Sequence, residues 1–282
     1  MRLCLGIIIL SIISFSFTCK KDTKNKDYYI DSEIKSKITQ ALIENYEGGN
    51  TIKMSEFYSQ LDSKSCKIKF KTSQNNNVLS NTELYNKCKQ GVLIIGKLFQ
   101  YKQSKKLHTY IATGFVISEE GYCVSNHHVF EKSKREDIKF LASIAMDCRG
   151  NLYKIEKVCA SSENNDIAIF KIKAKKTNLF PLKLSGMPKI GQKIHIISHP
   201  KSLFYKYTNG SISRHYLYEK DNSERMSVTA DFAVGSSGAP ILNNNGEVVG
   251  IVSSTFKIPN KRNSQMVIKE IIPINSLMKI IN

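Results

Sequence analysis

A serine flanked by two glycines near the C-terminal end of the chain has the surroundings of a catalytic nucleophile. Ser237 lies in the stretch Ala-Val-Gly-Ser-Ser-Gly-Ala-Pro, residues 233–240. Gly235 and Gly238 carry no side chain that would block an approaching carbonyl group, and Gly235 lets the backbone turn so that two N–H groups point at one spot. The N–H groups of Gly235 and Ser237 are therefore the candidate oxyanion hole for a tetrahedral intermediate.

A serine hydroxyl is a poor nucleophile at neutral pH, so this chemistry also needs a base. The chain offers two adjacent candidates, His127 and His128, just after a short β-type run. Neighbouring side chains point apart at a corner between a strand and a helix. Only one of the two histidines can therefore face Ser237.

Three aspartates compete to orient that histidine, namely Asp137, Asp147 and Asp166. Asp166 directly precedes the apolar run Ile-Ala-Ile-Phe-Lys-Ile at residues 167–172, which is typical of a buried strand. A rigid strand can hold a carboxylate against an imidazole, where it fixes the tautomer and stabilises the charged form. The sequence favours Asp166, so the candidate residues run His, Asp, Ser along the chain.

Several blocks of the sequence resemble HtrA-type bacterial serine proteases, which belong to the chymotrypsin clan. Residues 113–118, Gly121 and residues 125–129 resemble that family's block G-S-G-F-V-I-S, G, T-N-x-H-V. Later blocks follow in the family order at residues 165–168 (D-L-A), 235–240 (G-N-S-G-G-P), 246–253 (G-x-V-V-G-I) and 272–275 (I-P-I-N). The resemblance covers roughly residues 84–282.

The resemblance implies an all-β fold, with a chymotrypsin-like pair of six-stranded antiparallel β-barrels, a C-terminal helix and a small N-terminal α/β extension. The family's histidine directly precedes a valine, which selects His128 as the base beside Asp166 and Ser237. Ser236 stands where trypsin-like zymogens carry an aspartate, so we expect no activation by cleavage of that kind. The chain ends just after the final helix, so we expect no PDZ domain.

The length of 282 residues suits one protease domain, assigned to residues 81–282, with a tether and N-terminal extension over residues 20–80. The extension is expected to be a strap on the barrel, a spacer or a partner-binding module. Its apolar spacing predicts a helix over residues 31–46 that ends at Gly48-Gly49. Residues 66–71 alternate like a half-exposed strand, and Ser80 with Glu83 predicts a capping box.

The first 19 residues predict export. Arg2 precedes an apolar run over residues 3–17, which suits a signal peptide better than a membrane span. Cys19 closes the run and resembles the lipidated first residue of a mature bacterial lipoprotein. An ordinary cleaved signal and an uncleaved anchor are the alternatives. In each case the mature protein is expected outside the cytoplasm, in the periplasm or cell envelope.

Three further residues are candidates for substrate binding. An ungapped count back from Ser237 places Asp231 at the base of the primary pocket of trypsin-like enzymes, where a carboxylate would favour lysine or arginine. Ser253 and Ser254 lie on the run that would pair with the substrate backbone as an added strand.

The composition narrows the set of partners. The net charge of +18 comes mostly from scattered lysines without a nucleic-acid-binding motif, so nucleic acid is not expected as a partner. The histidine and cysteine spacings suggest no metal site, and no cofactor is implied. Five cysteines remain after Cys4 and Cys19, so at least one thiol is unpaired within the chain. The oligomeric state stays open.

These features predict an exported serine endopeptidase that hydrolyses peptide bonds in proteins or peptides through His128, Asp166 and Ser237. The alternative is a catalytically silent trypsin-like barrel that serves as an envelope binding or adhesion lipoprotein. The complete set of triad residues favours the enzyme.

Overall fold

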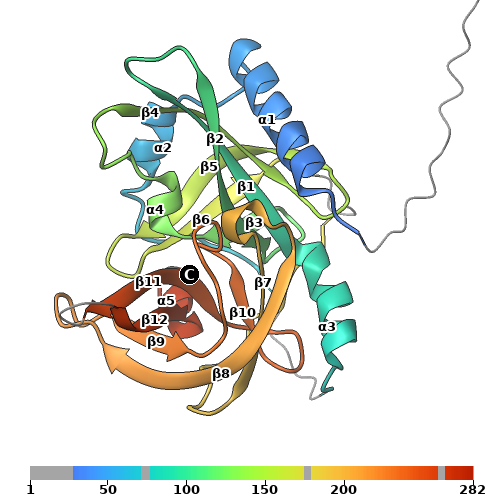
Figure 1. The fold of residues 1–282 in the computed structure, drawn as a ribbon, viewed down its shortest axis with the longest axis vertical. Coiled ribbons are helices and arrows are strands. Elements are labelled where there is room, and N and C mark those ends of the chain that lie inside the picture. Colours follow the sequence, from blue (N-terminus) through green and yellow to red (C-terminus); the bar gives the residue numbers. More distant parts are fainter. Residues whose placement is uncertain (1–27, 71–76, 175–178, 260–263, 282) are drawn as a thin grey trace, which may run out of the picture.

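The computed structural model describes residues 28–70, 77–174, 179–259 and 264–281, which form two closed antiparallel β-barrels (Figure 1). In pairing order, the N-terminal barrel contains β1 (Val92–Tyr101), β2 (Leu107–Val116), β3 (Tyr122–Ser125), β6 (Ile167–Ile172), β5 (Leu152–Ser162) and β4 (Ile138–Met146). The C-terminal barrel contains β10 (Pro240–Leu242), β11 (Val248–Pro259), β12 (Ser264–Pro273), β9 (Glu224–Val228), β8 (Lys206–Leu217) and β7 (Lys193–Ser198). The predicted pair of six-stranded barrels is confirmed.

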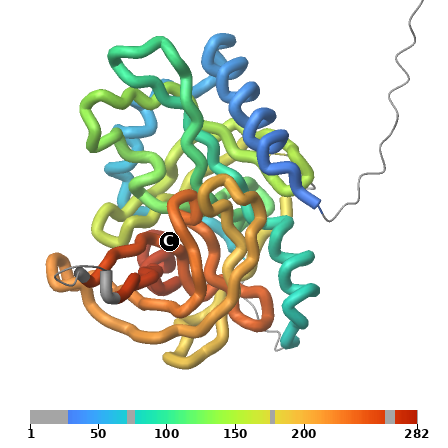
Figure 2. The backbone as a smooth tube through the Cα atoms, in the orientation of Figure 1, coloured from blue at the N-terminus to red at the C-terminus, as the bar shows by residue number. Residues whose placement is uncertain are grey.

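The barrels follow one another along the chain. Figure 2 shows green and yellow segments in the upper barrel and orange and red segments in the lower one. The strands are rich in β-branched and other apolar residues, which favours pleated, buried backbone. Leu93 and Ile95 of β1 face the core of the N-terminal barrel, with Phe130 and Phe170, so alternate residues of each strand fill its interior.

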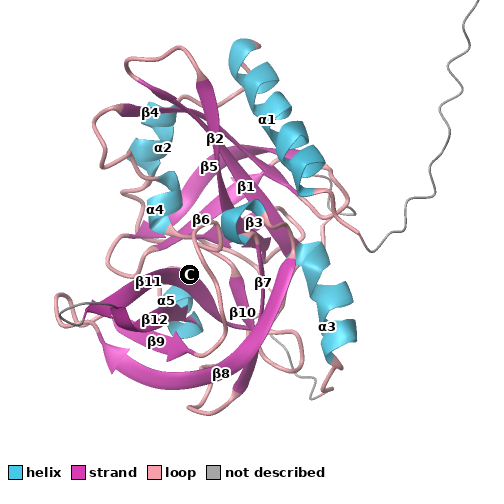
Figure 3. Ribbon diagram, viewed as in Figure 1, coloured by secondary structure: helices cyan, strands magenta, loops and turns pink. Residues whose placement is uncertain are grey.

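Helices of the extension cover the outside of the barrels (Figure 3). The predicted helix is confirmed as α1 (Asp31–Glu47), which ends at Gly48 and packs on β1 and β4. A Cβ at Gly96 of β1 would lie 2.9 Å from the end of the Ile38 side chain, so this glycine lets α1 approach closely. The predicted capping box is also confirmed, since the side chains of Ser80 and Glu83 open α3 (Asn81–Cys88).

Two features of the extension differ from the prediction. Residues 66–70 do not form a strand, and Cys66 makes only an isolated bridge with Ile281. Both barrels are closed, so neither has a free edge on which this segment could pair at length. The second helix, α2 (Met54–Gln60), was not predicted; at seven residues it is too short for a periodic signal, and Met54 and Phe57 fix it to the N-terminal barrel.

The chain ends with the expected helix, α5 (Ile274–Met278), directly after β12. The described residues contain no helix long and apolar enough to cross a membrane. The five cysteines of the described part, Cys66, Cys88, Cys123, Cys148 and Cys159, all have free thiols. The predicted signal segment and Cys19 lie outside the described residues.

Candidate active site

The predicted base and its carboxylate meet where two strands of the N-terminal barrel end. β3 and β6 are antiparallel neighbours, so the end of β3 lies at the start of β6. The short helix α4 (His127–Phe130) follows β3, which brings His128 beside Asp166, the residue before β6. His128 Nδ1 is 2.9 Å from both carboxylate oxygens, and the His128 backbone N–H donates to Oδ1 at 3.1 Å.

Asp166 is held in place from both barrels. Its φ of 53° is left-handed, a region that aspartate tolerates better than most residues. The Asn126 side chain donates to its carbonyl at 2.8 Å, and the Ser253 hydroxyl, from β11, donates to Oδ2 at 2.9 Å. Burial raises the pKa of Asp166, but His128 and Ser253 outweigh it, so the pKa lies below its usual value. Asp166 therefore stays ionised and can stabilise an imidazolium.

The adjacent histidine faces a different part of the N-terminal barrel. His127 Nδ1 lies 2.7 Å from the Ser161 hydroxyl, and its Nε2 lies 3.9 Å from the Glu131 carboxylate. The two imidazoles of α4 thus have separate partners. Only His128 contacts the carboxylate that the sequence favours.

The two competing aspartates have other partners. Asp137 pairs with Arg135 at 2.7 Å on the exposed surface. Asp147 is buried in a turn, where it accepts hydrogen bonds from Arg149 and Asn151. Neither carboxylate contacts a histidine among the described residues.

Ser237 lies half-buried where the two barrels meet. The Thr113 N–H of β2 donates to the Ser237 carbonyl at 3.0 Å. Gly238 follows with a φ of +83°, and a Cβ there would lie 2.2 Å from Ser125 Oγ, so only glycine fits. Within the described part, no hydrogen bond joins the Ser237 hydroxyl to His128, a contact that often tightens only when substrate binds. The Tyr110 phenol is within hydrogen-bonding reach of Ser237.

The turn before Ser237 has the conformation that an oxyanion hole requires. Ser236 N–H donates to the Ala233 carbonyl at 2.9 Å, and Gly235 has a φ of +101°, as at the third position of a type II turn. The Val234 carbonyl accepts from Lys201 N–H at 2.7 Å. Because C=O and N–H of a trans peptide point in opposite directions, the Gly235 N–H points away from Lys201.

Both predicted oxyanion donors are available for a ligand. Among the hydrogen bonds of the described residues, the N–H groups of Gly235 and Ser237 have no acceptor. The Thr113 hydroxyl donates to the Gly235 carbonyl at 2.8 Å, which fixes the next peptide as well. Ser236 is fully buried, and its hydroxyl lies 2.9 Å from that of Ser198. A neutral pair of serine hydroxyls therefore stands at the position where trypsin-like zymogens carry an aspartate.

The candidate substrate residues lie in different settings. A cavity of about 710 Å³ adjoins His128 and Asp166 and is lined by Ser253 and Ser254 of β11. Ser254 donates to Glu270 at 3.1 Å, while Ser253 serves Asp166. Asp231 has a side chain that is 72% exposed and pairs with Lys269 at 2.7 Å, so its carboxylate is not buried at the base of a pocket.

Sequence reasoning missed the residues that hold the site together. Thr113, Ser198 and Lys201 act on the turn through one or two hydrogen bonds each from distant parts of the chain, and the Lys201 contact uses only the backbone. No spacing rule reports such contacts. Thr113 was visible only as part of the Gly-Phe-Val-Ile block, and Tyr110 lies outside every block.

Comparisons with known proteins relate part of this chain to a family of peptidases. Residues 112–251 match the model of the trypsin-like peptidase domain. A probable periplasmic serine endoprotease, DegP-like, from Chlamydia trachomatis is 32% identical over 142 residues, which are 49% of this chain and 27% of that protein. The similarly named protein of Hahella chejuensis is 26% identical over 172 residues, which are 60% of this chain and 34% of its own length. The chain thus spans about a third or less of these curated relatives.

Solved structures share the fold. The serine endoprotease from Yersinia pestis superposes with a TM-score of 0.54 at 22% identity and covers 72% of this chain and 66% of its own. The HtrA-type protease AlgW with a tripeptide gives a TM-score of 0.56 at 19% identity and covers 71% and 62%.

Proposed function

Because residues 112–251 match the trypsin-like peptidase domain, we propose that this chain is an exported serine endopeptidase that cleaves peptide bonds in proteins or peptides. The observation that carries the proposal is the contact of His128 with Asp166, together with the N–H groups of Gly235 and Ser237, which have no acceptor among the described residues. The names of the DegP-like relatives, which describe periplasmic endoproteases, support the same activity.

The proposed reaction follows from the roles of the named atoms. Ser237 Oγ attacks the substrate carbonyl carbon while His128 Nε2 takes its proton, and the Gly235 and Ser237 N–H groups bind the resulting oxyanion. Asp166 holds His128 through Nδ1 and stabilises the imidazolium. The imidazolium then protonates the leaving amine, so the peptide C–N bond breaks and an acyl group stays on Ser237. Water, activated by the same histidine, releases the acyl group.

Labelling with a fluorophosphonate probe tests the nucleophile. We expect the probe to modify the wild-type chain and to leave Ser237→Ala unmodified, because the probe forms a covalent bond with an activated serine. Peptide hydrolysis measured on the same samples should be lost in the variant. Equal labelling of the two proteins, or labelling of neither, would instead support the silent barrel.

We also propose that the mature chain is anchored through a lipid on Cys19. The Lys-Lys-Asp that follows Cys19 and the apolar run before it support this placement. Metabolic labelling with a radioactive fatty acid should mark the wild type and not Cys19→Ser. Lipid label that persists in Cys19→Ser contradicts the anchor, whereas an unlabelled wild type points to an ordinary cleaved signal or an uncleaved anchor.

Substrate selection is proposed for Asp231, for Ser254 and for the backbone of Ser253, whose hydroxyl serves Asp166. Ser254 lines the cavity beside His128 and Asp166. Beyond Val252, β11 pairs with β12 and no longer with β10, which supports the addition of an extended peptide along its other edge. Lys269 contacts and largely neutralises the exposed Asp231 carboxylate, so a basic side chain of the substrate would have to replace Lys269 as its partner.

A further inference from the structure

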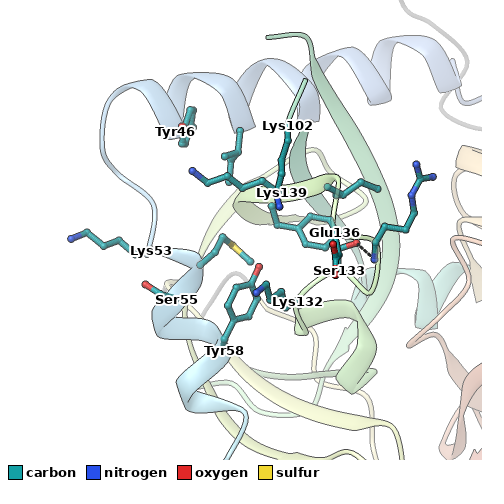
Figure 4. Close-up of a pocket in the computed structure, with 14 residues that line it drawn as sticks. Tyr46, Lys53, Ser55, Tyr58, Lys102, Lys132, Ser133, Glu136 and Lys139 are labelled. Atoms are coloured by element: carbon teal, nitrogen blue, oxygen red, sulfur yellow. Dashed lines mark hydrogen bonds between the residues drawn. The ribbon is translucent and has the colours of Figure 1, made fainter. Parts of the chain in front are cut away.

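A second cavity lies between the N-terminal helices and the N-terminal barrel, outside the catalytic cleft (Figure 4). Its volume is about 770 Å³, which is within the range of small-molecule sites. One wall comes from the end of α1 and from α2, with Tyr46, Met54 and Tyr58. The other comes from the segment after α4 and from the start of β4. The N-terminal extension, whose role is open, therefore builds one wall of this cavity.

The cavity is strongly basic. Five cations line it, namely Lys53, Lys102, Lys132, Arg135 and Lys139. Asp137 neutralises Arg135 through their ion pair, and Glu136 is the one carboxylate in the lining. Within the described part of the chain, none of the four lysines forms an ion pair with a carboxylate. Four lysines against one glutamate leave an excess of about three positive charges.

The four lysines are not equivalent in position. In Figure 4 the side chains of Lys102 and Lys132 run into the space between α2 and β4, whereas Lys53 extends away at its edge. Lysine binds phosphate well as a compact point charge. Two ammonium groups that enter one space suit an anion of more than one charge better than a single carboxylate.

The remaining lining is aromatic and apolar. Tyr46, Tyr58 and Phe140 supply rings, and Met54 and Leu141 supply aliphatic surface. Such a lining accepts the apolar body of a ligand, while a few polar groups fix its charged end. An inorganic anion alone would leave this surface in contact with water.

A buried lysine behind the cavity wall adds an independent observation. Lys97 of β1 is only 1% exposed, and its ammonium lies 3.5 Å from the centre of the Phe140 ring, which lines the cavity. Among the described residues, no carboxylate lies within ion-pair distance of it. A buried cation without an anionic partner is costly, so a bound anion nearby would offset part of that cost.

We propose that this cavity binds a phosphate group carried on an aromatic or aliphatic body. The phosphate would lie among Lys102, Lys132 and Lys139, and the body would pack on Tyr58 and Phe140. A phosphomonoester carries between one and two negative charges at neutral pH, which matches most of the excess positive charge. Soluble organic phosphates and the headgroup of phosphatidic acid share this chemistry.

Calorimetric titration of the full chain with phenyl phosphate tests the site. Wild type should bind phenyl phosphate more tightly than inorganic phosphate or phenol, which lack the body and the charge respectively. The double variant Lys102→Gln with Lys132→Gln should bind it about a hundredfold more weakly, because each of the two lost charge-assisted contacts costs about tenfold. These lysines are exposed, so the variant should unfold at the wild-type temperature.

The matched control removes two exposed lysines from the other barrel, Lys189→Gln with Lys193→Gln. It changes the net charge equally and should leave binding unchanged. Equal loss in both double variants, or unchanged binding in the cavity variant, would overturn the site. Vesicles of phosphatidylcholine with phosphatidic acid distinguish the sources: retention that needs Lys102 and Lys132 identifies a lipid ligand, and binding of phenyl phosphate alone identifies a soluble one. Failure of both probes overturns the proposal.

Discussion

Replacing His128 by glutamine should lower the rate of peptide hydrolysis by a factor of about 10⁴ or more, because the serine then has no base. Replacing His127 by glutamine should keep the rate within about tenfold of wild type. The difference follows from their partners, since His128 contacts Asp166 while His127 contacts Ser161. Glutamine is a fair substitute in both positions, as it keeps a polar side chain of similar reach.

The two variants form a matched pair because His127 and His128 are adjacent residues of the same helix, α4. Rates are measured with a fluorogenic protein substrate at saturating and low concentration, so that kcat and kcat/KM are separated. Circular dichroism and thermal unfolding establish that both variants fold. A large loss in His127→Gln with an active His128→Gln would reverse the assignment. Equal loss in both would show that the α4 helix as a whole matters.

The parts of the site that lie in continuous blocks could be predicted from the sequence. His128, Asp166 and Ser237 each follow or precede a short apolar strand, and strand ends are where a rigid barrel can aim side chains. The contact of Asp166 with His128 depends on one strand pairing, β3 with β6, which the sequence analysis did not specify. At each of these three positions, the residues next to it in the sequence were enough to predict its place in the site.

The supports of the site depend on contacts that no local pattern carries. Ser253 was expected to serve the substrate, yet its hydroxyl reaches across the barrels to Asp166. Lys201 reaches the oxyanion turn with its backbone N–H, in a stretch where its own φ of 53° is left-handed. The extension also shows that a local pattern does not report distant contacts. Residues 66–70 alternate like a strand, but both barrels are closed and offer no free edge on which this segment could pair at length.

Lys97 illustrates a buried group that neither the fold nor the triad requires. It alternates with core residues on β1, where a hydrophobic side chain would pack without cost. Burial lowers the pKa of Lys97 to about 7, with a small opposing effect of Glu131. A cation–π contact with the Phe140 ring compensates for part of the hydration that the Lys97 ammonium loses on burial. A lysine buried at this position without an ion pair among the described residues is consistent with a role at the cavity next to it.

Replacing Lys97 by methionine should therefore stabilise the ligand-free chain, and most strongly at neutral and acidic pH. Methionine has a similar unbranched length and no charge to desolvate. In wild type the unfolded chain holds the Lys97 proton up to about pH 10.4, whereas the folded chain releases it near pH 7, so the unfolded state binds more protons between these values. The destabilisation is absent above that window, grows as pH falls through it, and reaches full size, on the order of 4 kcal/mol, below it.

Chemical unfolding of both proteins across this range measures the effect. The advantage of Lys97→Met in free energy of unfolding should shrink by about 2 kcal/mol between about pH 7 and about pH 9, as the wild-type lysine becomes neutral in the fold. Lys139→Met, an exposed lysine on the same barrel, is the control and should give no such trend. A constant difference between Lys97→Met and wild type would mean that packing around this position, and not the buried charge, sets its stability. A phosphate ligand that binds the cavity should narrow the difference at neutral pH, because its charge stabilises the protonated lysine that the variant lacks.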